Sequence, residues 1–134
     1  MSAGSCTTVL KAYFDEEAEI ADPKRPHPEY DYSILESIDA DLTVGGELNK
    51  LATNLSYARS WAGIHYRSDT TAGLRVGERI ATAYLRDQLQ QRPADAYGGS
   101  RGEFSFTTFD GEPVTVTADG VSPNDAFDPP LFRS

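Results

Sequence analysis

Residues 58–69 read Ala-Arg-Ser-Trp-Ala-Gly-Ile-His-Tyr-Arg-Ser-Asp and join two stretches of helical character. Arg59 stands six positions before His65, and Asp69 stands four positions after it. Ser68 is a preferred N-cap residue type and Asp69 suits a first turn, so we expect a helix to begin here. The positive end of that helix, a guanidinium and an imidazole would together form a seat for a tetrahedral oxyanion.

The same residues allow a functional and a purely structural interpretation. In the functional one, Asp69 accepts the second ring N–H of His65, which fixes the tautomer and raises the basicity of the imidazole. In the structural one, His65 is a packing or surface residue and Asp69 is a helix opener favoured by the dipole. Arg59, His65 and Arg67 form the candidate cation cluster for an anionic ligand.

Length and composition favour one soluble domain over residues 1–134, because 39% of the residues are hydrophobic and the mean hydropathy is -0.47. A net charge of -9 argues against a nucleic-acid partner, which requires clustered Lys and Arg. No apolar run reaches the ~20 residues that span a bilayer, and no signal-peptide pattern opens the chain, so we expect no membrane partner. The single cysteine, Cys6, excludes an internal disulfide and is expected to be a small packed residue.

Apolar spacing predicts three principal helices, over residues 5–17, 47–61 and 69–91. The first ends in the acidic run Asp15-Glu16-Glu17, and the second follows Gly45-Gly46. The apolar stripe of the second helix consists of Leu48, Leu51, Leu55 and Ala58. The apolar face of the third consists of Ala72, Val76, Ile80 and Tyr84, continued obliquely by Leu85 and Leu89.

Further patterns concern the contacts between these helices and the rest of the chain. Gly73 and Gly77, four residues apart, would permit close contact of the third helix with another helix. Residues 21–46 form a long connection interrupted by prolines, which is expected to be a lid or a segment packed on another part of the protein.

The C-terminal part of the sequence has the pattern of a β-hairpin. Residues 103–107 and 113–117 alternate apolar and polar side chains on either side of Asp110-Gly111. The inward side chains that would cover a helix face are Phe104, Phe106, Val114 and Val116. Residues 118–134 are expected to be an irregular tail, with Phe127, Leu131 and Phe132 as anchors on a partner. The predicted fold is mainly α, a helical bundle fragment with a small C-terminal β-hairpin.

The spacing Arg59-x5-His65-x3-Asp69 resembles the third signature of the vanadium haloperoxidase and phosphatidic acid phosphatase superfamily. Three other stretches, residues 6–16, 42–52 and 104–111, look like parts of bacterial vanadium-dependent haloperoxidase homologues. The resemblance therefore covers roughly residues 5–117.

The resemblance implies a role for each residue of the signature. Arg59 would be the oxyanion-binding residue, His65 the catalytic residue and vanadium ligand, and Asp69 the catalytic residue that orients it. The implied cofactor is vanadate, with phosphate or sulfate as other occupants. Peroxide and halide are the implied small-molecule partners, since the family oxidises halide to hypohalous acid. Tyr30 and Tyr32 of the long connection would border the substrate entrance.

Two further signatures complete the family's pocket, K-x6-R-P and P-[SA]-G-H, and this sequence contains neither. Lys24-Arg25-Pro26 ends like the first, but Ala18 stands where its Lys belongs. His27 follows Pro26 without the Ser-Gly or Ala-Gly of the second. The chain therefore looks like the C-terminal part of a family member whose N-terminal half is missing, and activity of the chain alone is left open.

Three hypotheses for function follow. The first is a haloperoxidase-like protein whose vanadate or phosphate site is completed by parts absent from this chain. The second is an acid phosphatase of the same superfamily, with His65 as nucleophile. The third is a non-catalytic helical remnant or assembly module, in which exposed apolar faces favour a homo-oligomer. The similarity around residues 45–50 favours the haloperoxidase branch.

Overall fold

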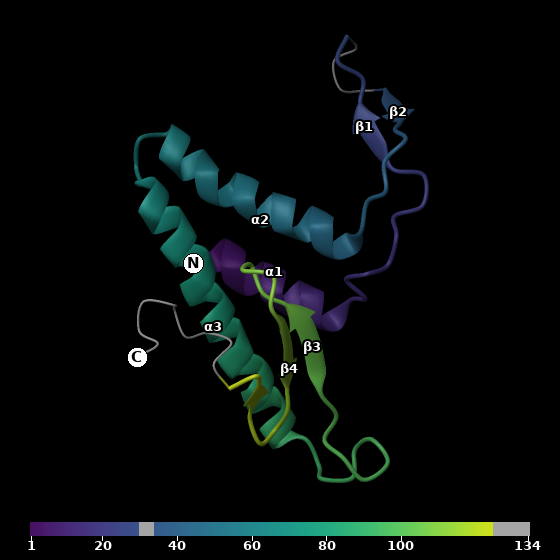
Figure 1. The fold of residues 1–134 in the computed structure, drawn as a ribbon, viewed down its shortest axis with the longest axis vertical. Helices are drawn as coiled ribbons and strands as arrows, with labels where there is room; N and C mark the ends of the chain where they lie inside the picture. The colour runs from purple at the N-terminus through teal and green to yellow at the C-terminus, as the bar shows by residue number, and fades with distance from the viewer. Residues whose placement is uncertain (30–33, 125–134) are drawn as a thin grey trace.

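Three helices form the frame of the protein, and a short turn connects the second helix to the third (Figure 1). The structure, a computed structural model, describes residues 1–29 and 34–124. The helices are α1 (Ser2–Tyr13), α2 (Val44–Trp61) and α3 (Arg67–Gln91). From the turn between them α2 and α3 diverge, and α1 lies between these two helices and contacts both. None of the described helices has the length and apolar character that crossing a membrane requires.

The strands form two small antiparallel sheets. One pairs β1 (Lys24–Pro26) with β2 (Leu35–Ser37), within the predicted long connection. The other has the order β3 (Phe104–Thr107), β4 (Pro113–Val116) and β5 (Val121–Ser122). The mainly helical prediction is thus confirmed, but the predicted single hairpin is incomplete, because the expected irregular tail supplies a third strand. Residues 125–134 of that tail, with Phe127, Leu131 and Phe132, lie outside the described residues.

Helix boundaries differ from the prediction where capping contacts decide them. The first helix stops at Tyr13, so the acidic run Asp15-Glu16-Glu17 lies beyond its end and not in its last turn. The second begins three residues earlier than predicted, because the Thr43 hydroxyl accepts the N–H of Gly46 at 3.1 Å and so caps a first turn that contains two glycines.

The core lies between the C-terminal half of α3 and the three-stranded sheet. Leu85 and Leu89 on α3 are fully buried. They pack against the predicted inward side chains of the sheet, Phe104, Phe106, Val114 and Val116, together with Ala118. The alternation read from the sequence therefore predicted the buried face of the sheet correctly.

Glycines at the crossing of α1 and α3 allow the two helix backbones to approach closely. A Cβ on Gly77 would lie 2.2 Å from the carbonyl oxygen of Met1, and one on Gly4 would lie 2.4 Å from that of Leu74. Helix backbones approach this closely only where a side chain is missing. The predicted close contact of α3 at Gly77 is confirmed.

Most of the apolar faces predicted for α2 and α3 are exposed, and only the oblique continuation of the α3 face, Leu85 and Leu89, lies in the core. On α3, the exposed fractions of Val76, Ile80 and Tyr84 are 45%, 48% and 51%. On α2, Leu51 and Leu55 are likewise exposed. Val76, Ile80 and Tyr84 are exposed because the glycine row of α3 permits the closer backbone contact and turns a different face of the helix towards α1.

Two charged side chains are buried where α1, α3 and the β3–β4 turn meet. Lys11 is 0% exposed and its ammonium donates to Thr107 O and, at 3.3 Å, to Asn49 Oδ1. Glu78 is 2% exposed and its Oε1 accepts the Phe109 N–H at 2.9 Å. Burial lowers the pKa of Lys11 and raises the pKa of Glu78 to about 6.

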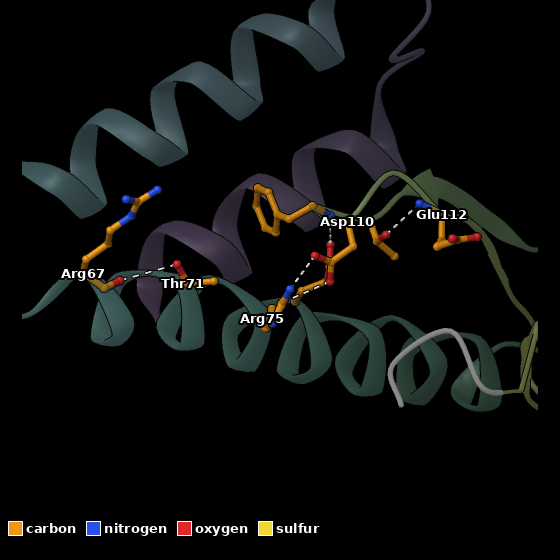
Figure 2. Close-up of polar contacts among 8 residues, drawn as sticks. Arg67, Thr71, Arg75, Asp110 and Glu112 are labelled. Atoms are coloured by element: carbon orange, nitrogen blue, oxygen red, sulfur yellow. Dashed lines mark hydrogen bonds and ion pairs between the residues drawn. The ribbon is translucent and has the colours of Figure 1, made fainter. Parts of the chain in front are cut away.

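An exposed ion pair holds the same turn to α3 from outside. Figure 2 shows Arg75 of α3 reaching Asp110, which accepts from Nε at 3.1 Å and from Nη2 at 2.7 Å. Two carboxylates thus attach the β3–β4 turn to α3. The buried carboxylate of Glu78 on α3 accepts a backbone N–H of the turn, and the exposed carboxylate of Asp110 in the turn accepts from the guanidinium of Arg75 on α3.

Gly77→Ala should destabilise the protein by about 3 kcal/mol, because the new methyl group must push α1 away from α3. Gly120→Ala is the matched control, since a Cβ there meets no atom within 4 Å. Urea unfolding followed by circular dichroism measures both. Equal midpoints for the two variants would contradict the glycine crossing.

Glu78→Gln should change how stability depends on pH. Burial raises the pKa of the Glu78 carboxyl from 4.5 to about 6. Between these two pH values the folded wild type therefore keeps a proton on Glu78 that the unfolded chain has already released. The wild type therefore loses about 2 kcal/mol relative to the variant as pH rises from about 4.5 through 6. Urea unfolding across this pH range measures the difference. The exposed Glu112→Gln variant should instead follow the wild-type curve, and an identical course for E78Q would refute the assignment.

Candidate functional site

The turn between α2 and α3 brings the predicted site residues together. The Arg59 carbonyl, in the last turn of α2, accepts the Ile64 N–H at 3.1 Å. Gly63 has a φ of +72°, a left-handed conformation that glycine adopts without a steric penalty. The chain therefore reverses within a few residues and places His65 beside the end of the helix that carries Arg59.

Arg59 and His65 are in direct contact. Nε of Arg59 donates to Nε2 of His65 at 2.9 Å. An imidazole nitrogen that accepts a hydrogen bond carries no proton, so the neutral ring holds its proton on Nδ1. The guanidinium and the unprotonated ring nitrogen consequently lie side by side.

Asp69 connects the imidazole to the start of α3. Its Oδ2 lies 3.8 Å from Nδ1 of His65, beyond hydrogen-bond distance but close enough for electrostatic attraction. The same oxygen accepts the Tyr66 N–H at 3.0 Å and so caps the helix. The N-cap position belongs to Tyr66, and the prediction that Ser68 caps this helix was wrong, because Asp69 reaches the free N–H from the first turn.

Two other residues singled out in the sequence lie differently. Arg67 is exposed in the first turn of α3, and in Figure 2 its guanidinium makes no bond with the other residues drawn. Cys6 is a free, exposed thiol, so the expectation of a packed cysteine was wrong. Tyr30 and Tyr32, predicted to border a substrate entrance, lie outside the described residues.

The site opens into a groove of about 710 Å³ between α1, α2 and α3. Leu10 of α1 and Leu51 and Leu55 of α2 line its apolar part. Arg59, His65, Asp69 and Thr70 line its polar part. The side chains of His65 and Asp69 are 40% and 51% exposed, so a ligand in the groove would reach the ring.

The donor set bears on which cofactor the groove could take. In residues 1–29 and 34–124, no group of three or more His, Cys, Asp or Glu side chains gathers as a metal site would require. One imidazole with an adjacent guanidinium suits instead a single bond from nitrogen together with a cation for the ligand's oxygens. These residues fit an oxyanion such as vanadate or phosphate, as the resemblance implies.

Comparison with known proteins finds similar sequences among vanadium-dependent bromoperoxidases. No family model matches the chain. It is 37% identical over 114 residues to a vanadium-dependent bromoperoxidase of Corallina pilulifera and 35% identical over 114 residues to that of Corallina officinalis. It is 33% identical over 126 residues to the bromoperoxidase of Ascophyllum nodosum. These matches cover 85%, 85% and 92% of the chain.

These identities support a relationship to the haloperoxidases. The chain is similar to vanadium-dependent bromoperoxidases, all three of algal origin. It spans about a fifth of the length of these curated relatives, 18% of the two Corallina proteins and 22% of the Ascophyllum protein.

Sequence reasoning missed one contact at the site. The hydroxyl groups of Ser60 and Thr70 lie 3.1 Å apart and join the end of α2 to the start of α3. No spacing rule indicates such a pair. The sequence offers one hint of this contact: Ser60 directly follows Arg59 and Thr70 directly follows Asp69, so both hydroxyl groups adjoin residues of the signature.

Asp69→Ala should lower the free energy of unfolding by about 1 kcal/mol, because the variant loses the acceptor for the Tyr66 N–H. Ser68→Ala, one residue earlier, should change it by less than about 0.5 kcal/mol, as expected for a surface substitution. Urea unfolding at neutral pH compares the two. A larger loss in S68A would restore Ser68 as the cap.

Proposed function

We propose that this chain supplies the histidine and arginine part of an oxyanion site in a vanadium-dependent haloperoxidase-like protein. The observation that carries the proposal is the 2.9 Å contact between Arg59 Nε and His65 Nε2 at one end of the groove. The contact places an unprotonated nitrogen beside a permanent positive charge. Because Nε2 has one lone pair, an anion that bonds it would displace the Arg59 N–H, and the guanidinium would then donate to the oxygens of that anion.

Each residue has a distinct part in this proposal. His65 would use its Nε2 lone pair as the single protein ligand of vanadium, and Arg59 would turn its guanidinium to the oxygens. Asp69 lies 3.8 Å from Nδ1 and would favour the tautomer in which Nε2 carries no proton. When bound, vanadate would supply the peroxide-dependent oxidation of halide, and the similarity to bromoperoxidases makes bromide the halide to test first.

The proposal also assigns a role to the apolar part of the groove. Leu51 and Leu55 are 51% and 56% exposed although they lie beside the site. The relatives are about five times longer than this chain. We propose that further protein segments complete the site with additional cations, because one guanidinium and the dipole of α3 do not balance a multiply charged oxyanion.

The proposal is tested by orthovanadate binding to the full chain, followed by ⁵¹V NMR. We expect weak binding that His65→Ala abolishes and that Arg59→Ala weakens by at least about tenfold, as the loss of a charge-assisted hydrogen bond implies. His27→Ala, which changes the other histidine of the chain, is the matched control and should bind like the wild type.

Four measurements on the same samples separate the alternatives: bromide oxidation, phosphate-ester hydrolysis, orthovanadate binding and the association of chains. Bromide oxidation with vanadate and peroxide should be negligible for the chain alone, because the completing cations are missing. Hydrolysis of a chromogenic phosphate ester that His65→Ala abolishes would favour the phosphatase. Orthovanadate binding that neither H65A nor R59A alters would overturn the site, and stable association of chains would then favour the assembly module.

A further inference from the structure

The hydroxyl pair of Ser60 and Thr70 lies beside the candidate site, and Thr70 itself lines the groove. Ser60 follows Arg59 in α2, and Thr70 follows Asp69 in α3. Their oxygens are 3.1 Å apart, and Thr70 is only 6% exposed. The pair is therefore a partly buried hydrogen bond between the last turn of one helix and the first turn of the next.

The contact between Arg59 and His65 needs such support. Both residues are exposed, and so are the turn residues 62–66 that connect them. A hydrogen bond between exposed side chains is weakened by competition with water and by the entropy of holding long side chains in place. A shielded bond close beside it is electrostatically stronger and limits how far the two helix ends separate.

Other buried threonines show what a purely local role looks like. The hydroxyl of Thr82 donates to the Glu78 carbonyl, and that of Thr8 to the Gly4 carbonyl, each at 2.9 Å and four residues back in its own helix. Such bonds serve the helix that contains them. Thr70 differs, because its partner is a side chain on another helix.

We propose that Ser60 and Thr70 are positioning residues whose hydrogen bond sets the spacing of α2 and α3 at which Arg59 Nε meets His65 Nε2. They act through Arg59 and His65, without bonding the anion themselves. The consequence for oxyanion affinity rests on the proposed function, whereas the effect on the Arg59–His65 contact does not.

The contact itself is read from the ¹⁵N NMR signals of the His65 ring at fixed pH. Arg59→Ala defines the signal of an Nε2 without its donor. Thr70→Val and Ser60→Ala should each move the Nε2 signal towards that value, and Thr70→Ser, which restores a hydroxyl, should return it. Thr82→Val is the matched control, because it removes a buried hydroxyl from the same helix, and it should leave the signal in place.

Orthovanadate affinity gives the second readout. Thr70→Val should weaken binding by about tenfold, and the double variant S60A/T70V should be no weaker, because one bond is lost in each. An unchanged Nε2 signal in both T70V and S60A, or an equal shift in T82V, would overturn the positioning role. If the wild type binds no orthovanadate, the proposed function fails, and the Nε2 signal alone then decides the role of the pair.

Discussion

The close crossing of α1 and α3 is the constraint on which the rest of the structure depends. At Gly4 and Gly77 the two backbones lie so near that neither position has room for a Cβ. Because the crossing holds the N-terminal half of α1 against α3, the C-terminal half reaches over β3, where Lys11 bonds Thr107. The same crossing leaves α1 facing α2 across a groove.

The two ends of α3 have different roles, because one end packs in the core and the other lines the groove. Its C-terminal half holds Leu85 and Leu89 in the core against the sheet, and this is where the chain buries most of its large apolar side chains. Its N-terminal end carries Asp69 and faces the groove together with Arg59 and His65. Stability is thus concentrated away from the candidate site, which remains open to a ligand or to another protein segment.

Buried polar contacts link these two regions. Lys11 and Glu78 lie inside the junction of α1, α3 and the β3–β4 turn, each with a partner from the strand or turn. Because an unpaired charge in such surroundings is unfavourable, these bonds select one arrangement of the sheet on the helices. The described residues thus combine a core of their own with an open groove that has an apolar and a polar part.

The sequence by itself determined what neighbouring residues decide: three helices, the pairing of Phe106 with Val114, and the nearness of Arg59 to His65 around one short turn. These follow from local periodicity and chain connectivity. Only the tertiary structure decided which helix faces are buried and that the hydroxyl groups of Ser60 and Thr70 meet beside the site. Such features depend on partners brought together through space, and residue spacing along the chain carries no record of them.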